Sequence, residues 1–367
     1  MRPFHVLICD DQPDVRHALH LMLKGAGYQT QTVDSPRELL TAARSQAFDL
    51  ILADLNYTRD TTSGEEGLDL LASLEAQGNE TPIVVMTAWG SIDLAVEAMR
   101  RGACDFIQKP WDNARALAVV RKQAESVRRR KSELEIAAAV QQRMFPHAVP
   151  TLASLEYAGH CAAAQGIGGD YYDFLDLGPG RVGFVLGDVS GKGVPAALLM
   201  ANLQACFRSQ SPAGFLDIVH CLSTVNQHFF ASTTSDRYAT LFFGIYDEAA
   251  RTLRYVNCGH CPPLLQRADG RLESLDPTAT PLGAFEEWSC EAAEIALLPG
   301  DTLLLYSDGV SEAVNPAGEE FGVERLVPLL RPAKPATALV DAITAAVSRF
   351  SEGTRTDDVT VVAIRAL

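Results

Sequence analysis

The stretch FDLILAD, residues 48–54, decides the fold of the first third of the chain. Its four consecutive apolar residues end in an aspartate, which is typical of a strand buried on both faces of a parallel sheet. Further strands are predicted at residues 4–9, 29–33, 81–88 and 104–109. Helical segments separate them, as at residues 15–24, where apolar side chains repeat on one face. Strands that alternate with helices predict right-handed crossovers and an α/β domain on a five-stranded parallel sheet.

Polar side chains follow these predicted strands at their carboxyl ends, where parallel sheets collect ligands. They are Asp10, Asp11, Asp54, Thr87 and Lys109. A carboxylate that accepts a phosphoryl group needs a divalent cation to neutralise both anions, and a side-chain cation to hold the phosphoryl oxygens. Asp54 is placed as the nucleophile, with Asp10 and Asp11 near the cation. Lys109 can hold the phosphoryl oxygens, and the Thr87 hydroxyl can sense the new group.

These residues resemble the response-regulator receiver family. The resemblance covers residues 4 to about 123, and a receiver domain is predicted at residues 1–123. It implies a flavodoxin-like fold, a sensor histidine kinase as partner and Mg²⁺ as cofactor. It also implies roles for single residues: Asp54 as phosphoacceptor and metal ligand, Asp11 as a direct and Asp10 as an indirect Mg²⁺ ligand, Asn56 as a ligand through its backbone carbonyl, Thr87, Lys109 and Phe106 as the switch, and a cis peptide bond before Pro110. The loop LNYTRDTTSGEEG, residues 55–67, departs from the family because it is longer and lacks the usual proline.

A long helix is predicted over residues 113–144, within a connector at 113–146 that Pro146 ends. Apolar residues repeat near a heptad spacing along it: Leu117, Val120, Ala124, Val127, Leu134, Ala138 and Phe145, with Lys131 and Gln141 as polar interruptions. This seam predicts a homodimer through the connector helix. The alternative is a solvated linker helix with one apolar stripe packed on a domain.

The pattern changes in the last part of the chain, residues 147–367. Apolar strands are predicted at residues 181–190, 238–247, 252–259, 301–309 and 357–365, several of them paired as hairpins. Asp269–Gly270 is a strong turn signal, and Pro195 begins a helix. Closely spaced hairpins with a few long helices predict an α+β domain of antiparallel sheet flanked by helices.

Aspartates beside glycines or at strand ends recur through this second domain. They are Asp170, Asp188, Asp308 and Asp357, the last followed by Asp358. Glycine next to a carboxylate allows a tight turn and close approach of the backbone to a ligand. Several carboxylates that converge on hard cations are what a two-metal hydrolase needs to activate a water against phosphorus.

From about residue 137 onward, these motifs resemble the metal-dependent serine/threonine phosphatase (PPM) family, in its bacterial branch that regulates sporulation and stress sigma factors. QQRMFP, residues 141–146, resembles the first helix of that branch. The resemblance implies a β-sandwich flanked by helices and two Mn²⁺ or Mg²⁺ ions. Asp188 would bridge both metals beside the Val189 carbonyl. Asp308 and Asp357 would complete the first metal site, and Asp170 would lie close to the metals.

The same resemblance implies that the substrate is a phosphorylated anti-sigma-factor antagonist, and that phosphorylation of Asp54 controls the phosphatase through the connector. Whether it activates or inhibits is left open, as is the grip on the substrate phosphate, since no arginine matches the clamp of eukaryotic relatives. The alternative is a phosphorylation-dependent adaptor whose phosphatase-like domain is not catalytic. NCGHCPPLL, residues 257–265, matches the branch and predicts a structural role for His260 and no zinc at Cys258 and Cys261.

Charge and composition exclude several other classes of protein. The formal net charge of −15 argues against nucleic-acid binding, which needs a basic face. Eight cysteines in 367 residues indicate buried thiols in a reducing compartment. No secretory signal is apparent, and no apolar run approaches the ~20 residues of a membrane helix. The sequence therefore predicts a cytoplasmic protein that contacts no membrane.

Overall fold

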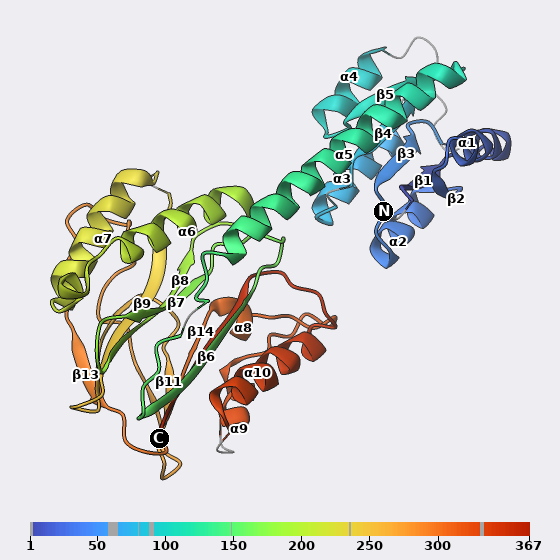
Figure 1. The fold of residues 1–367 in the computed structure, drawn as a ribbon. Coiled ribbons are helices and arrows are strands. Elements are labelled where there is room, and N and C mark those ends of the chain that lie inside the picture. Colours follow the sequence, from blue (N-terminus) through green and yellow to red (C-terminus); the bar gives the residue numbers. More distant parts are fainter. Residues whose placement is uncertain are drawn as a thin grey trace. The chain divides into compact units, whose positions relative to one another are not determined.

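A computed structural model describes residues 3–57, 65–79, 81–87, 92–147, 149–234, 236–330 and 334–367. The chain divides into two compact units, Met1–Glu133 and Leu134–Leu367 (Figure 1). The division falls inside the long helix α5 (Asn113–Gln142), within the predicted connector. None of the described helices has both the length and the apolar character that crossing a membrane requires.

The first unit is the predicted five-stranded parallel sheet, with strand order β2-β1-β3-β4-β5. Its strands are β1 (His5–Cys9), β2 (Gln29–Val33), β3 (Leu50–Asp54), β4 (Ile83–Thr87) and β5 (Asp105–Gln108). Its helices are α1 (Pro13–Gly25), α2 (Pro36–Ser45), α3 (Glu65–Ala76), α4 (Ile92–Arg100) and the first part of α5. Successive residues of a strand point to opposite faces. Ile51 therefore packs in the core on one side of the sheet and Leu52 in the core on the other.

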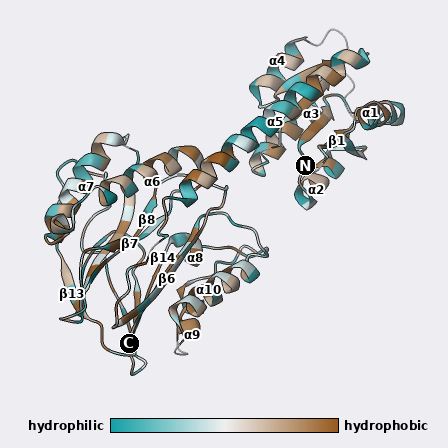
Figure 2. Ribbon diagram, in the orientation of Figure 1, coloured by the Kyte–Doolittle hydropathy of each residue, from teal (hydrophilic) through white to brown (hydrophobic). Residues whose placement is uncertain are grey.

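Helix α5 is hydrophilic along its middle stretch (Figure 2). The first part of its predicted seam, from Leu117 to Val127, packs on the sheet of the first unit and is already covered. Further along, Ile136 and Val140 are 63% and 52% exposed. These two exposed residues are not positions of the predicted seam, and the predicted homodimer through the connector helix stays a prediction.

The second unit contains two five-stranded antiparallel sheets, in the orders β13-β10-β9-β8-β7 and β12-β11-β14-β15-β6. The strands are β6 (Leu155–Ala162), β7 (Tyr171–Asp176), β8 (Arg181–Val189), β9 (Ala239–Asp247), β10 (Thr252–Cys258), β11 (Leu264–Gln266), β12 (Leu272–Ser274), β13 (Ala293–Ala296), β14 (Thr302–Tyr306) and β15 (Val359–Ala366). The helices are α6 (Gly193–Arg208), α7 (Ile218–Ser232), α8 (Asp308–Ser311), α9 (Val327–Leu330) and α10 (Ala336–Phe350), with short 3₁₀ turns at Pro212–Phe215 and Val323–Arg325.

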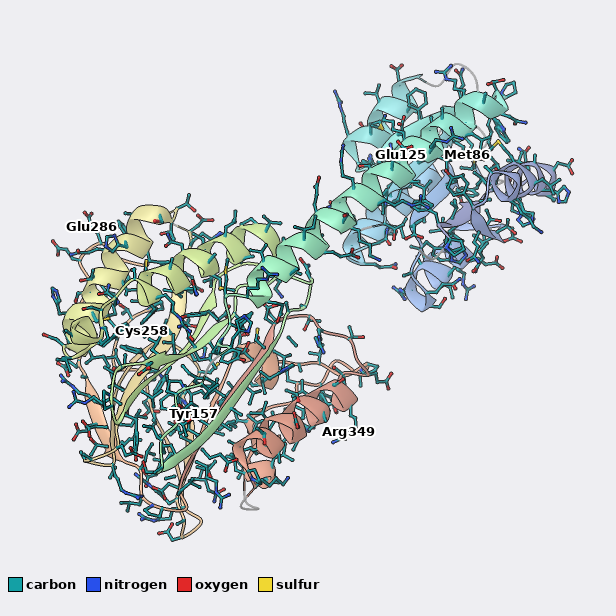
Figure 3. All side chains as sticks on the ribbon, in the orientation of Figure 1. Met86, Glu125, Tyr157, Cys258, Glu286 and Arg349 are labelled. Carbon is teal, nitrogen blue, oxygen red and sulfur yellow. The ribbon has the colours of Figure 1, made fainter. Side chains whose placement is uncertain are left out.

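The two sheets pack face to face over a shared core, so the predicted β-sandwich is confirmed. Phe184 and Phe242 of the first sheet meet Leu303 and Val362 of the second. Helices α6 and α7 cover the outer face of the first sheet, and α10 covers that of the second (Figure 1). Side chains fill the space between these layers (Figure 3). The β-β sandwich with helices on both outer faces brings the ends of β8, β14 and β15 to one region.

Candidate active site

The first unit gathers its predicted site residues at one edge of the parallel sheet. Asp54 and Thr87 are the last residues of β3 and β4, Asp10 follows β1, and Lys109 follows β5. Parallel strands present their carboxyl ends at the same edge, which is why residues so far apart in the sequence meet here. Carboxylate oxygens of Asp10, Asp11 and Asp54 all lie within 4.8 Å of one another.

Lys109 joins two of these carboxylates. Its Nζ donates to Asp10 Oδ2 at 2.6 Å and to Asp54 Oδ2 at 2.8 Å. Burial raises the pKa of Asp54 to about 6, although the Lys109 ammonium opposes this rise. Burial alone would lower the pKa of Lys109, but attraction to Asp54 and Asp10 leaves that pKa raised. The pair therefore keeps the Asp54 carboxylate beside the Lys109 cation in a largely buried pocket.

The donor atoms in this pocket fit a hard divalent cation. The side-chain oxygens Asp11 Oδ1 and Asn56 Oδ1 are buried and have no hydrogen-bond partner among the described residues. Buried oxygens without a donor are costly unless a cation or water satisfies them. The Mg²⁺ ion predicted for this pocket would be surrounded by the carboxylates of Asp10, Asp11 and Asp54.

The predicted switch residues lie beside the pocket. Thr87 is 2% exposed, and its backbone carbonyl accepts the Lys109 N–H at 2.7 Å. The Lys109–Pro110 peptide bond is cis. Phe106 lies on β5 with 38% of its surface exposed. Most of the unusual loop at residues 55–67 lies outside the described residues, so its effect on kinase approach stays a prediction.

In the second unit, a cavity of about 380 Å³ collects most of the predicted metal ligands. Asp188 lies near the end of β8, Asp308 begins α8, and Asp357 precedes β15. All three line this cavity together with Val189, the predicted carbonyl ligand. Hairpin topology explains the meeting, because β8, β14 and β15 present these ends to the same end of the sandwich.

The carboxylates of this cavity repel one another. Burial, and then the charges of Asp308 and Asp357, raise the pKa of Asp188 to about 7. Burial and the Asp357 charge also raise the pKa of Asp308. Within the part of the chain that is described, these side chains are spaced more widely than the 4.8 Å cluster of the first unit. Carboxylates that destabilise each other's charges, together with a backbone carbonyl oxygen, are a fitting donor set for Mn²⁺ or Mg²⁺.

Asp170, predicted to lie close to the metals, does not line the cavity. It directly precedes β7, is 2% exposed, and accepts the Thr360 hydroxyl at 2.5 Å. Burial, and then the charge of Asp188, raise its pKa well above the usual range. Asp170 is therefore a buried neighbour of Asp188, and the predicted role near the metals would be indirect.

Asp358 has a structural role. The sequence alone did not distinguish this role from that of the adjacent Asp357. Its Oδ1 accepts the Ala164 N–H at 2.8 Å, and its Oδ2 accepts the N–H groups of Gly169 at 2.7 Å and Asp170 at 3.3 Å. A carboxylate that holds three backbone donors fixes the turn in front of β7. Asp357 lines the cavity, whereas Asp358 holds the neighbouring backbone in place.

Lys192 is a site residue that sequence reasoning missed. Its Nζ lies 2.7 Å from Asp357 Oδ2 and donates to the Thr356 carbonyl at 2.6 Å. Among the described residues that line the cavity, Lys192 is the one lysine or arginine. The GKG sequence, with Gly191 at φ 94° and Gly193 at φ 69°, was a readable signal. It places a cation on a tight turn directly before α6.

His260 is held by its surroundings. Its Nδ1 pairs with the Thr240 hydroxyl at 2.9 Å, and its backbone N–H donates to Asn257 Oδ1 at 2.8 Å. Burial lowers the pKa of His260 to about 4, so the ring is neutral at physiological pH. Burial also raises the pKa of Cys261 to about 12, so its thiol is neutral at physiological pH.

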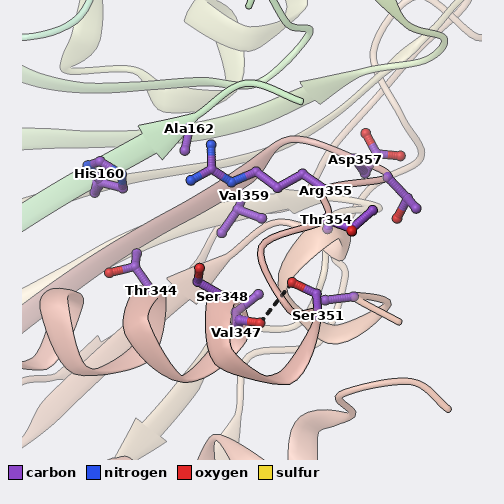
Figure 4. A pocket seen from close by; sticks show the side chains of 13 residues that line it. His160, Ala162, Thr344, Val347, Ser348, Ser351, Thr354, Arg355, Asp357 and Val359 are labelled. Atoms are coloured by element: carbon purple, nitrogen blue, oxygen red, sulfur yellow. Dashed lines mark hydrogen bonds between the residues drawn. The ribbon is translucent and has the colours of Figure 1, made fainter. Parts of the chain in front are cut away.

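A second, much smaller cavity, which Asp357 also lines, lies between α10 and β6 (Figure 4). Arg355 extends into it toward Ala162 and His160, away from the Asp357 carboxylate. Its volume of about 30 Å³ leaves room for water molecules only. This arginine therefore does not face the cavity that the carboxylates line.

The raised pKa of Asp188 gives a testable pH dependence. Between pH about 4 and about 7 the unfolded chain releases a proton that the folded chain keeps, so stability of the metal-free protein falls as pH rises through this window. Mn²⁺ has to displace that proton at low pH. We expect Mn²⁺ to raise the Tm of the second unit more at pH about 8 than at about 5.5, measured by calorimetry. Equal Mn²⁺ shifts at both pH values would contradict the assignment, and Asp188→Asn should lose the shift.

Comparisons with known proteins agree with both units. A family model described as "Response regulator receiver domain" matches residues 6–121, and one described as "Stage II sporulation protein E (SpoIIE)" matches residues 178–367. Protein IcfG of Synechocystis sp. is 29% identical over 63% of this chain and 41% of its own length. "Phosphoserine phosphatase RsbP" of Bacillus subtilis is 28% identical over 50% of this chain and 46% of its own length.

A crystal structure of the RsbU and RsbW domains of Rv1364c from Mycobacterium tuberculosis is also similar, at 29% identity and a TM-score of 0.53. The similarity covers 61% of this chain and 63% of that one. The chain spans less than half the length of the two curated relatives above. Fold and site define a receiver domain joined to a β-sandwich with a carboxylate-lined cavity. Because the SpoIIE model matches more than half of its residues, the chain belongs to the Stage II sporulation protein E (SpoIIE) family.

Proposed function

We propose that the second unit is a metal-dependent phosphatase that removes phosphate from serine or threonine of a partner protein. The observation that carries the proposal is the cavity where Asp188, Asp308 and Asp357 meet and burial with mutual repulsion raises the pKa of Asp188 to about 7. Such a site is costly without cations and suited to two of them. The name of the relative RsbP, a phosphoserine phosphatase, supports the same reaction.

Within this proposal, the residues of the site have separate roles. Asp188 would hold both ions, the Val189 carbonyl would be an adjacent ligand, and Asp308 and Asp357 would complete the first metal site. Two bound Mn²⁺ or Mg²⁺ ions would supply an activated water and neutralise the phosphoryl oxygens. Asp358 keeps the wall of the cavity in place through its three backbone hydrogen bonds.

The reaction is tested with Mn²⁺-dependent hydrolysis of p-nitrophenyl phosphate, followed by a phosphoserine peptide. We expect activity with Mn²⁺, none after a chelator, and recovery when Mn²⁺ is restored. A protein that binds Mn²⁺ in the second unit but releases no phosphate from either compound would favour the adaptor alternative. This comparison therefore separates an enzyme from a binding module.

Lys192 is our candidate for the grip on the substrate phosphate. When cations neutralise Asp357, the ammonium that now pairs with that carboxylate at 2.7 Å is free to bind a phosphoryl oxygen. A hydrogen bond to a charged group contributes about 1.5–3 kcal/mol, so loss of the ammonium should raise KM about 10- to 100-fold. We expect this for Lys192→Met, with partial recovery in Lys192→Arg, in p-nitrophenyl phosphate kinetics.

The matched control is Lys24→Met, which removes an exposed lysine of the first unit. It should leave KM unchanged. If Lys192→Met keeps the wild-type KM at saturating Mn²⁺, the phosphate is held by other groups. The proposed metal site would survive that result.

The receiver domain gives the proposed phosphatase a control input. We infer that a sensor histidine kinase phosphorylates Asp54 with Mg²⁺ in the pocket, and that the connector transmits the change, as its position in the chain between the units suggests. By analogy with the sigma-factor branch, the proposed substrate is a phosphorylated anti-sigma-factor antagonist. Phosphosite mapping of proteins that co-purify from the native cell would identify the substrate and test this assignment.

A further inference from the structure

We propose that His260 binds the substrate in addition to its predicted structural role, by donating its Nε2–H to an oxygen of the phosphoryl group. His260 lines the cavity of the second unit together with Asp188 and Asp308, and only 2% of its surface is exposed. Its Nε2 is buried and has no hydrogen-bond partner among the described residues. A buried polar atom in this condition is costly unless a ligand or a water molecule satisfies it.

The backbone of His260 is held by a single buried side chain. Asn257 Oδ1 accepts the His260 N–H at 2.8 Å, and Asn257 Nδ2 donates to the His260 carbonyl at 3.2 Å. Gly259, at φ 66°, makes the tight turn between these two residues, and a Cβ on it would be 3.0 Å from Pro281 Cγ. The Asn-x-Gly-His stretch therefore keeps the imidazole in a fixed place in the cavity wall.

The ring is also held at its other nitrogen. Nδ1 of His260 pairs with the Thr240 hydroxyl at 2.9 Å. Thr240 is the residue of β9 that lies opposite Asp188 of β8, and it also lines the cavity. The pair therefore places the imidazole beside the strand end that carries a proposed metal ligand. The structural role accounts for the backbone and for Nδ1, and it leaves Nε2 unexplained.

The surroundings of the ring favour a proton on Nε2. Burial lowers the pKa of His260, so the imidazole is neutral and carries one proton, and the Tyr306 carbonyl opposes this lowering by favouring a proton on the ring. When the Thr240 hydroxyl donates to Nδ1, that proton belongs to Nε2. A neutral imidazole in this form is a hydrogen-bond donor at Nε2.

A phosphoryl group in this cavity needs donors. Ionised carboxylates, which form much of the cavity wall, only accept hydrogen bonds, and the phosphoryl oxygens are themselves acceptors. Lys192 offers one donor from the turn before α6. His260 offers a second from the other side of Thr240. A fixed donor in a buried site stabilises negative charge that develops during the reaction, because it needs no reorganisation.

A neutral imidazole can instead bind a metal ion, but this would require the lone pair of Nε2. The proton favoured there excludes that use. The cavity also supplies carboxylate oxygens and the Val189 carbonyl as ligands without the histidine. The geometry therefore favours contact with the phosphoryl group over contact with a cation.

The inference rests on the proposed function and is tested in the full chain with His260→Asn and His260→Gln. The asparagine amide reaches the position of Nδ1 but not that of Nε2, whereas the glutamine amide reaches the position of Nε2. Loss of one fixed donor to a developing anion costs about 10²- to 10³-fold in rate. We expect His260→Asn to lower kcat/KM for p-nitrophenyl phosphate about 10²-fold. Inhibition by inorganic phosphate should weaken about tenfold or more.

Both quantities should recover in part in His260→Gln, which restores a donor at the position of Nε2. Mn²⁺ affinity, measured by calorimetric titration, should match wild type in both variants. The matched control is His220→Asn, at an exposed histidine on α7, and it should change none of the three measurements.

A second measurement reads the contact directly in wild type. In the Mg²⁺-loaded protein with ¹⁵N-labelled histidine, inorganic phosphate should shift the Nε2–H signal of His260, which is assigned by its absence in His260→Gln. This experiment carries the comparison should His260→Asn not fold. An Nε2–H signal that stays in place at saturating phosphate would overturn the inference.

The outcomes separate this inference from the proposed function. If a folded His260→Asn keeps the wild-type kcat/KM and phosphate inhibition, His260 is structural only and the phosphatase stands. Weaker Mn²⁺ binding with unchanged phosphate inhibition would make the ring a metal ligand and would also overturn the inference. If wild type itself releases no phosphate with Mn²⁺, the proposed function fails first.

Discussion

Asp188→Asn is expected to abolish Mn²⁺-dependent hydrolysis of p-nitrophenyl phosphate, with a loss of about 10³-fold or more. Asp188 lines the cavity, and burial together with the charges of Asp308 and Asp357 raises its pKa to about 7. Removal of its charge weakens the hold on both proposed cations at once. Metal ions contribute several kcal/mol of charge stabilisation in the transition state, and about 4 kcal/mol corresponds to this loss in rate. Initial rates at saturating Mn²⁺ provide the measurement.

The same substitution should raise the stability of the metal-free protein, although it lowers the activity. Above pH about 7 the folded, metal-free protein carries a strained negative charge at Asp188, which asparagine removes. Asp188→Asn should therefore raise the metal-free Tm at pH about 8 while activity disappears. Asp341→Asn, an exposed aspartate on α10, is the matched control for both measurements. Substantial Mn²⁺-dependent activity in a folded Asp188→Asn would remove Asp188 from the metal site.

The fold was predictable where burial leaves a strong pattern in the sequence. The parallel strands of the first unit are apolar on both faces, so β3 and β4 stand out as short runs between helices. Strands β6 and β13 are among those that were not predicted. Both lie at edges of their sheets, and most of their side chains are half-buried or exposed, so neither alternates clearly between apolar and polar residues. Edge position removes the hydrophobic signal that sequence reasoning uses.

The candidate site was predictable to the extent that strand ends are predictable. Asp188, Asp308 and Asp357 lie where strands end or begin, and the fold brings them to one cavity. The supporting contacts were not predictable, because their partners are distant in sequence. Gln141 and Gly168 are separated by 27 positions, and Gly169 and Asp358 by 189. Only the folded sandwich shows that Asp358 supports a wall while Asp357 faces the cavity.

Asp54→Asn is expected to eliminate phosphorylation of the first unit by acetyl phosphate. The substitution removes the nucleophilic carboxylate and leaves the Lys109 ammonium paired with Asp10 at 2.6 Å, so the pocket keeps a cation but has no acceptor at the end of β3. Labelling is measured by mass spectrometry of the intact protein under mild conditions. Asp69→Asn, an exposed aspartate on α3, should label as wild type does. Equal labelling of Asp54→Asn would place the phosphoacceptor elsewhere.

The two variants together decide whether the receiver controls the proposed phosphatase. If Asp54 is the input, acetyl phosphate with Mg²⁺ changes the hydrolysis rate of wild type and of Asp69→Asn but not of Asp54→Asn. The comparison is made over a range of protein concentrations, because a homodimer through the connector helix would make the response depend on concentration. Wild type that is fully labelled yet unchanged in rate at every concentration would show that phosphorylation at Asp54 does not reach the cavity. The metal site would then act independently of the receiver, and any coupling would have to require the partner protein itself.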